Sequence, residues 1–203
     1  MPRAERRVQL LKVAYDIISE SGVAALNMSA LAERSGAAKP IVYEHFENSQ
    51  EVVFCILDDY FQNMSNYVLD RNSGLENIND FFDVSIDAMF EFHIKEKFNL
   101  KRITNGFSIH EKTNNLFFEY NKRSVSFYRI MLEQQGVDKK DSEIPASILH
   151  ELILGTVNNY ASRKNVGAAK AMLKQAVRGF LGTLVKPTGQ KPVAPTQVLK
   201  LKP

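Results

Sequence analysis

The segment from Asn27 to Glu51 constrains the fold more than any other part of the chain. Two short apolar patterns typical of helices lie on either side of Gly36, a residue suited to the positive φ that often follows a helix end. Asn27 is a good N-cap for the first pattern, and Pro40 fits the first turn of the second. Two helices joined by such a turn predict a helix-turn-helix, whose second helix can enter the major groove of DNA.

This segment resembles the DNA-binding head of the TetR family of bacterial transcriptional regulators. The shared features are a long first helix, a polar cap, an apolar-alanine pair, a glycine after the second helix, a Tyr-x-His-Phe run and a polar start to the fourth helix. They correspond here to Arg6 to Ser21, Asn27, Leu31-Ala32, Gly36, Tyr43 to Phe46, and Asn48. Ala38 stands where the family often has serine, and Ser49 where it often has lysine. The resemblance covers roughly the first quarter of the chain.

Several residues of the predicted second and third helices, and of the turn between them, are candidates for contact with DNA. They are Ser29, Ala38, Lys39, Pro40, Ile41, Tyr43, Glu44 and His45. Lys39 can pair with guanine O6 and N7, and Glu44 can accept from cytosine N4 or simply remain solvated. The resemblance implies phosphate contacts for Tyr43 and His45, and the alternative is that both pack against neighbouring helices. Ser29 can reach a phosphate from a helix N-terminus, or it has no role in binding.

Composition excludes several classes of protein. The 203 residues include no uninterrupted apolar run long enough to span a membrane. Cys55 is the single cysteine, so an internal disulfide is excluded and a cytoplasmic location is expected. One cysteine and four scattered histidines show no metal-site spacing. Without a glycine-rich phosphate loop or a nucleophile motif, we expect neither an enzyme nor a cofactor.

The net charge of +3 is unevenly distributed along the chain. Residues 1–50 carry six basic and six acidic side chains, whereas residues 163–203 carry nine basic and no acidic ones. Because a DNA-binding domain is commonly basic, the placement of cations must matter here more than their number. Basic residues gather at the start of the first helix: Arg3, Arg6, Arg7 and Lys12.

Apolar residues recur at three- and four-residue steps and never alternate over a strand-length stretch, so the sequence predicts an all-α fold. Beyond the head, the predicted helices span about Asn48–Leu69, Glu76–Lys97, Leu100–Phe107, Glu111–Gln135, Pro145–Arg163 and Ala168–Val185, with Gly167 as a break before the last. We expect a helix-turn-helix domain at 1–48, a ligand-binding and dimerisation domain at 49–186, and a disordered proline-rich tail at 187–203.

Aromatic residues are abundant between residues 81 and 128, and they predict either a packed core or, by the resemblance, a cavity for a lipophilic small molecule. The candidate pocket residues are Phe82, Met89, Phe90, His93, Phe107, His110, Phe117, Asn121 and Tyr128. One acidic stripe runs along the helix predicted at 76–97. It consists of Asp80, Asp83, Asp87 and Glu91. We interpret this stripe as a solvated face, with attraction of a cationic ligand as the alternative.

By the resemblance, the last two long helices pair with their symmetry mates in a homodimer. The candidate interface residues are Leu149, Leu152, Ile153, Leu173, Val177, Phe180 and Leu181. The expected function is therefore that of a repressor, which binds palindromic double-stranded operator DNA as a homodimer and is released by a lipophilic ligand. The alternative is an architectural or nucleoid-binding protein with the same head and no small-molecule ligand. An open cavity would favour the first, and a filled core the second.

Overall fold

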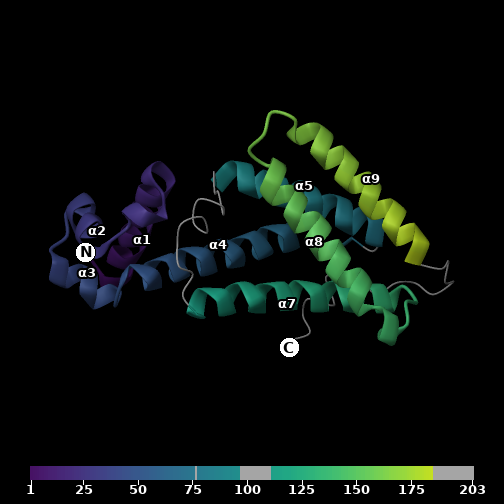
Figure 1. The fold of residues 1–203 in the computed structure, drawn as a ribbon, viewed down its shortest axis with the longest axis horizontal. Helices are drawn as coiled ribbons and strands as arrows, with labels where there is room; N and C mark the ends of the chain where they lie inside the picture. The colour runs from purple at the N-terminus through teal and green to yellow at the C-terminus, as the bar shows by residue number, and fades with distance from the viewer. Residues whose placement is uncertain (76, 97–110, 185–203) are drawn as a thin grey trace. The chain divides into compact units, whose positions relative to one another are not determined.

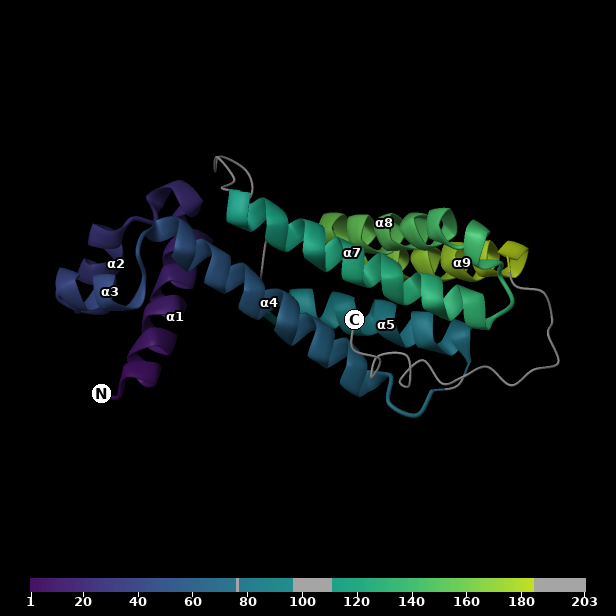
Figure 2. The ribbon, with the colours of Figure 1, turned by 90° about the horizontal axis from the view of Figure 1, so that it is seen from below.

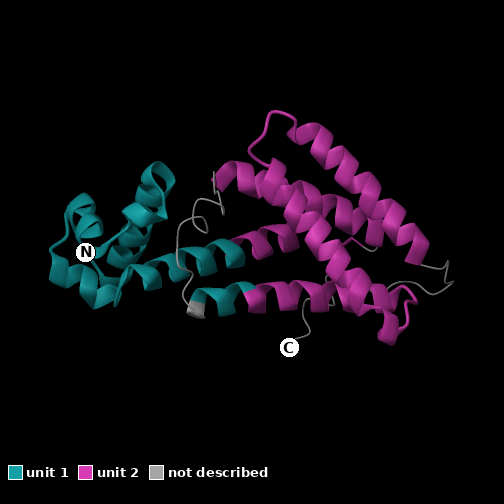
Figure 3. Cartoon of the chain, viewed as in Figure 1, with its two compact units in different colours: residues 1–62, 98–117 teal, residues 63–97, 118–203 magenta. Residues whose placement is uncertain are grey.

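A computed structural model of the protein describes residues 1–75, 77–96 and 111–184 (Figure 1). Within these ranges all regular structure is helical, which confirms the predicted all-α fold. The chain divides into two compact units, shown in Figure 3. Unit 1 comprises Met1–Gln62 and Phe98–Phe117, and unit 2 comprises Asn63–Lys97 and Phe118–Pro203. The predicted short helix at 100–107 and the tail at 187–203 lie outside the described residues.

Unit 1 begins with three α-helices, α1 (Arg3–Ser21), α2 (Met28–Ser35) and α3 (Lys39–His45), and a short 3₁₀ turn η1 (Val23–Ala25) separates the first two. Helix α1 starts three residues earlier than predicted, because the charged residues from Arg3 onward are good helix formers that carry no apolar period. The helix ends at Ser21 as predicted, and Gly22 follows it at a φ of 83°. A core of aliphatic side chains with one aromatic ring holds these helices together: Leu10, Ala14, Ile17, Ile18, Leu31, Val42 and Phe46.

The three residues that join α3 to α4 (Ser49–Arg71) are all held by hydrogen bonds. The amide of Phe46 donates to the Val42 carbonyl at 3.1 Å. The amide of Glu47 donates to Glu51 Oε2 at 2.6 Å, and the amide of Glu51 donates to Asn48 Oδ1 at 2.9 Å. This reciprocal arrangement is a variant of the capping box, in which Glu51 reaches one residue further back than in the usual motif.

Unit 2 contains the end of α4, then α5 (Ile78–Glu96), most of α7 (Glu111–Gln134), α8 (Glu143–Tyr160) and α9 (Val166–Leu184), with a 3₁₀ turn η2 (Lys139–Asp141) before α8. Helices α5, α8 and α9 pack against one another (Figure 2). Helix α8 begins two residues before Pro145, which is tolerated in a first turn. The predicted break at Gly167 is wrong, since Gly167 lies in the first turn of α9, where the backbone N–H groups have no intrahelical acceptor.

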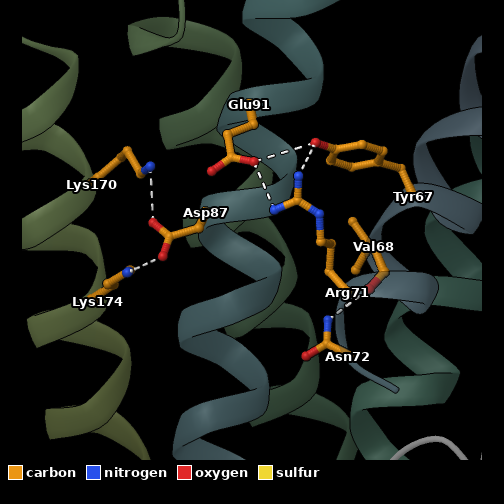
Figure 4. A network of polar contacts seen from close by, with 8 residues as sticks. All are labelled: Tyr67, Val68, Arg71, Asn72, Asp87, Glu91, Lys170 and Lys174. Carbon is orange, nitrogen blue, oxygen red and sulfur yellow. Dashed lines mark hydrogen bonds and ion pairs between the residues drawn. The ribbon is translucent and has the colours of Figure 1, made fainter.

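Part of the acidic stripe of α5 pairs with the last helix rather than with solvent. Lys170 and Lys174 donate to the two carboxylate oxygens of Asp87 at 2.9 and 2.5 Å (Figure 4). Asp83 forms a bidentate ion pair with Arg178. These contacts place two of the stripe's carboxylates against cations of α9, one helical turn apart.

The opposite end of the stripe pairs with α4. Glu91 accepts from Arg71 at 2.9 Å and from the Tyr67 hydroxyl at 3.3 Å (Figure 4). Asp80 is the member of the stripe that is exposed. The interpretation of the stripe as a solvated face is therefore wrong for Asp83, which is mostly buried, whereas Asp87 and Glu91 are partly exposed and also paired with cations. Cations on two helices distant in sequence already neutralise them, which sequence periodicity alone does not reveal.

Candidate nucleic-acid interface

The turn between α2 and α3 follows from the residues that close each helix. The Asn27 side chain accepts from the amides of Ser29 and Ala30 at 3.1 and 2.9 Å, so it caps α2 as predicted. Gly36 adopts the left-handed conformation, with φ 66°, and ends the helix. The Ala37 amide then returns to the Ala32 carbonyl at 3.1 Å. The chain thus reverses within a few residues and begins α3 at Lys39.

Helix α3 is divided into a buried and an exposed side. Val42 is buried within it, and Phe46 is buried just after it. The opposite side consists of predicted DNA contacts that are exposed: Lys39, Pro40, Tyr43 and Glu44. Tyr43 is 55% exposed, which is unusual for a large aromatic side chain. Because Tyr43 is not needed for the core, its hydroxyl is free to meet a ligand outside the chain.

The remaining DNA candidates border this exposed side. Ile41 and His45 are half-buried, and the His45 ring lies against the Phe46 ring with centroids 6.3 Å apart. Ser29 and Ala38 are exposed at the starts of α2 and α3. All eight candidates therefore lie on the helix-turn-helix at or near its surface, and contact with DNA stays a prediction for each.

Two of the basic residues at the start of α1 have partners that the sequence did not indicate. Arg3 Nη2 donates to the Glu44 carbonyl at 3.2 Å. Arg7 Nη1 donates to the His45 carbonyl at 3.0 Å, and its Nη2 donates to Cys55 Sγ at 3.1 Å. Their partners are main-chain groups and a thiol 38 to 48 residues away. Charge clustering in the sequence cannot reveal such contacts.

Five of the predicted pocket residues are packed in the interior of unit 2. Phe82 and Phe90 have no exposed surface, and Met89, His93 and Tyr128 are buried as well. The Phe82 and Tyr128 rings lie with centroids 5.2 Å apart. Asn121, on α7, is half-buried. These residues come from α5 and α7, and they line the same apolar interior.

The other pocket candidates lie elsewhere or cannot be placed. Phe117 belongs to unit 1, where its ring meets Phe61 edge-on with centroids 5.5 Å apart. Phe107 and His110 lie outside the described residues. The set predicted from aromatic abundance is therefore not brought together as one group, because abundance carries no information about which helix faces which.

Buried polar groups in unit 2 were only partly anticipated. His93 Nδ1 donates to the Met89 carbonyl at 2.9 Å, and its Nε2 lies 3.2 Å from the Asn158 side-chain amide. His150 Nε2 lies 3.1 Å from the side-chain amide of Asn121. His150 and Asn158 are not among the pocket residues that the sequence predicts, although both lie on α8, and polar residues within a largely apolar helix are the signal that could have found them.

The electrostatics of this interior favour neutral side chains. Burial lowers the pKa of His93, although hydrogen bonds to Met89 and Asn158 act in the opposite direction. Burial likewise lowers the pKa of His150, against the attraction of Glu151. Burial raises the pKa of Tyr120 to about 12 and also raises that of Tyr128. The polar groups of this interior are therefore neutral hydrogen-bonding groups.

The predicted dimer residues divide into two groups. Leu149, Ile153, Leu173, Val177 and Leu181 are buried inside the single chain. Their periodicity marked them for the dimer seam, but their burial assigns them to the core of the protomer. Leu152 and Phe180 are half-buried and remain available to a partner. The exposed apolar residues of α8 and α9 are different ones, Ile144, Ile148 and Met172.

A surface groove of about 590 Å³ runs between α5 and α9. It is lined by Asp83, Ala171, Lys174, Gln175, Arg178 and Gly179. None of these lining residues was a pocket candidate, and the charged ones already pair with each other or with Asp87. In the described part of the chain no cluster of ligands able to hold a metal ion is present. No described helix combines the length and apolarity needed to cross a membrane.

Comparison with known proteins agrees with this geometry. Residues 10–54, which include the helix-turn-helix, match the family described as bacterial regulatory proteins, tetR family. The chain is also 29% identical over 92 residues to the HTH-type transcriptional activator FasR of Mycolicibacterium smegmatis. This match covers 45% of the chain and 42% of FasR, so the chain spans about two fifths of the length of that relative.

Solved structures resemble the fold over most of its length. A TetR-like transcriptional regulator from Rhodococcus sp. RHA1 aligns with a TM-score of 0.70 at 20% identity, covering 90% of this chain and 99% of its own. The fatty acid degradation regulator FadR from Bacillus halodurans gives 0.69 at 15% identity, covering 91% and 97%. The SmeT–triclosan complex gives 0.65 at 18% identity, covering 92% and 97%. Residues 10–54 thus match the tetR family of bacterial regulatory proteins, and the chain as a whole shares the fold of these solved regulators.

Proposed function

We propose that this chain is a transcriptional regulator that binds operator DNA through α3. The observation that carries the proposal is the exposed side of α3, where Lys39, Tyr43 and Glu44 stand clear of the core within the family-matched segment. A lysine and a carboxylate can read base edges, and a tyrosine hydroxyl can contact a phosphate.

The same proposal includes a homodimer whose seam lies on α8 and α9. In the single chain Met172 is 72% exposed on α9, and Ile148 is 45% exposed on α8. Leu152 and Phe180 lie beside them, half-buried. A two-fold dimer would present two copies of α3 about 34–36 Å apart, one turn of DNA, and so would read a palindrome.

The regulator is proposed to respond to a lipophilic small molecule bound in unit 2. Support comes from the apolar interior with neutral polar groups around His93 and His150, and from relatives whose names concern fatty acid degradation and triclosan. A ligand that favours one conformation of the dimer lowers its operator affinity, and operator DNA must then lower the ligand affinity by the same factor. We propose repression, as the resemblance implies, whereas the name of the FasR relative describes activation.

The test is selection of duplex DNA from a random library by the full chain at two salt concentrations. The expected result is enrichment of one palindrome with half-sites one helical turn apart, bound more weakly as salt rises. A reporter gene under a promoter that overlaps this palindrome then distinguishes repression from activation. A selection that enriches no palindrome would contradict the proposed function.

The alternative, an architectural DNA-binding protein without a ligand, is favoured by the fully buried rings of Phe82 and Phe90. Thermal unfolding against a lipophilic compound collection distinguishes the two. A regulator gains about 2.7 kcal/mol of stability at a hundredfold ligand excess over the dissociation constant, and the same ligand weakens DNA binding. A compound that stabilises the chain without changing operator affinity would contradict ligand control.

A further inference from the structure

Helix α3 is too short to be stable by itself. It spans seven residues, and isolated helices below about 12 residues are marginal in water. At its N-terminus Ala38 provides no side-chain cap, in contrast to Asn27 at the start of α2. The orientation of α3 therefore depends on what holds its sides and its C-terminal end.

The last carbonyl groups of any helix lack partners within the helix, and they form the negative end of its dipole. In α3 the Val42 carbonyl accepts from the Phe46 amide. The carbonyls that follow are satisfied from α1, because Arg3 donates to the Glu44 carbonyl and Arg7 donates to the His45 carbonyl. Two guanidinium groups, four residues apart on one helix, thus satisfy two carbonyls near the end of another.

Arg7 is held at this point by more than one interaction. Its guanidinium carbon lies 4.4 Å from the centroid of the buried Phe46 ring, and its second nitrogen donates to Cys55 Sγ on α4. One side chain therefore connects α1, the end of α3 and the second turn of α4. The planar group reaches the carbonyl and the sulfur with separate N–H donors while it covers the ring, which a lysine ammonium cannot do.

We propose that Arg3 and Arg7 are positioning residues for DNA recognition, which act by capping the C-terminal end of α3 and fixing its direction. This inference rests on the proposed function of α3. It assigns two cations of the N-terminal cluster to contact with the protein main chain rather than with DNA phosphates. Arg7 has the larger effect, because Arg3 is exposed and makes one hydrogen bond.

The salt dependence of DNA binding separates capping from phosphate contact. A cation that neutralises a phosphate contributes about 0.9 to the slope of log affinity against log salt, whereas a capping cation contributes nothing to it. Arg7→Met is expected to lower affinity for the selected palindrome about tenfold, with an unchanged salt slope. Arg7→Lys keeps the charge but loses the planar guanidinium with its separate N–H donors, so its affinity is expected to recover only part of the loss.

The opposite outcome would overturn the inference: a slope that falls by about one in Arg7→Met together with full recovery in Arg7→Lys. Binding is measured well below the unfolding temperature of each variant. Arg3→Met provides a second variant at an exposed position, with an expected loss of about threefold. Arg6→Met is the matched control, because Arg6 Nη1 donates to Gln9 on its own helix at 2.8 Å.

A second measurement needs no DNA. Amide hydrogen exchange of the full chain is expected to become faster for Glu44, His45 and Phe46 in Arg7→Met and Arg3→Met, and to stay unchanged in Arg6→Met. If the wild-type chain binds no duplex, the proposed function fails while exchange still tests the cap. If exchange and affinity both remain at wild-type values in the Arg3 and Arg7 variants, the capping inference fails and the proposed function stands.

Discussion

The exposed side of α3 in unit 1 and the apolar interior of unit 2 show opposite relations between sequence and structure. Around α3 the predicted residues are neighbours in sequence, and they lie together at the surface. In unit 2 the predicted residues are spread over several helices, and the structure distributes them between core, surface and the other unit. Lys39 and Tyr43 lie where the sequence predicts, whereas Phe117 and Leu149 do not.

The difference shows which physical information is local. Turn chemistry depends on one or two residues, so Asn27 and Gly36 determine where α2 starts and ends. The partner of a buried side chain depends on helices far away along the chain, and an apolar period states only that some face is covered. The apolar period does not show whether that helix face is covered by the same chain, by a ligand or by a second copy of the chain.

The largest expected effect tests whether the interior of unit 2 is filled. Phe82→Ala should destabilise the fold by about 3–5 kcal/mol, because it removes a ring with no exposed surface that contacts Tyr128. Urea unfolding measures the loss, with the exposed Tyr43→Ala as control at about 0.5 kcal/mol or less. A loss below about 1 kcal/mol would mean that the Phe82 ring borders empty space, and the contrast between the regions would weaken.

The next effect concerns the surface that the comparison leaves open in unit 2. Replacing Ile148 and Met172 by glutamate should dissociate a dimer, because buried unpaired charges cost several kcal/mol. Sedimentation should then give half the wild-type mass, while the unfolding of each protomer changes little. Val166→Glu serves as a control at a half-buried site where α9 begins. A double variant that still sediments as a dimer would place the seam elsewhere.

A smaller effect sharpens the role of the exposed side of α3. Tyr43→Phe removes only the hydroxyl and should weaken binding of the selected duplex by about 1 kcal/mol, across all sequences. Lys39→Ala should also change which palindrome is preferred, because a lysine can contact guanine directly. Quantitative binding to matched and mismatched duplexes checks both. Neither variant should alter stability, and a large fall in unfolding temperature would show that these side chains belong to the core.

The interior of unit 2 should also respond to acid. Burial lowers the pKa of His93, so the folded state favours the neutral ring. The resulting stability is complete above the unfolded pKa of about 6.5, and it is lost as pH falls through that value toward the lower native pKa. His150 acts with the same sign. His93→Gln should therefore reduce the loss of stability between about pH 7.5 and about pH 5.5, measured by urea unfolding, and an unchanged pH profile would contradict the assignment.

The smallest effect concerns the ion pairs between α5 and α9. Burial would raise the pKa of Asp87, but hydrogen bonds from Lys174 and Lys170 outweigh it and lower the pKa. The stabilisation is thus present above the unfolded pKa of about 3.9 and is lost as pH falls through the lower native value. Because about a third of the side chain is exposed, Asp87→Asn should cost less than about 1 kcal/mol and less again in high salt. The exposed Asp80→Asn is the control, and equal losses in the two variants would show that the pairing does not stabilise the fold.

The sequence predicted the positions of the helices well, but it did not predict which side chains contact one another across helices. Individual residues show why. The bounds of α2 and α5 follow from caps and apolar period to within about two residues. The sequence pattern of its helix predicts Asp87 to be a surface residue, because the lysines that neutralise it lie 83 and 87 residues later in the chain. Arg7 reads as part of a charge cluster, because its carbonyl partner is 38 residues away. Such tertiary contacts have no local signature.

The short connection from α3 to α4 has a mechanical consequence. Phe46, Glu47 and Asn48 each form a hydrogen bond with α3 or α4, so the connection between the two helices is restrained. Because Glu47 and Asn48 are bonded to the first turn of α4, a rotation of that turn is expected to rotate α3 as well. A bent or rotated first turn of α4 would therefore also turn the exposed side of α3. Inserting one glycine after Glu47 would make this connection more flexible. A rotation of α4 would then be transmitted to α3 less completely.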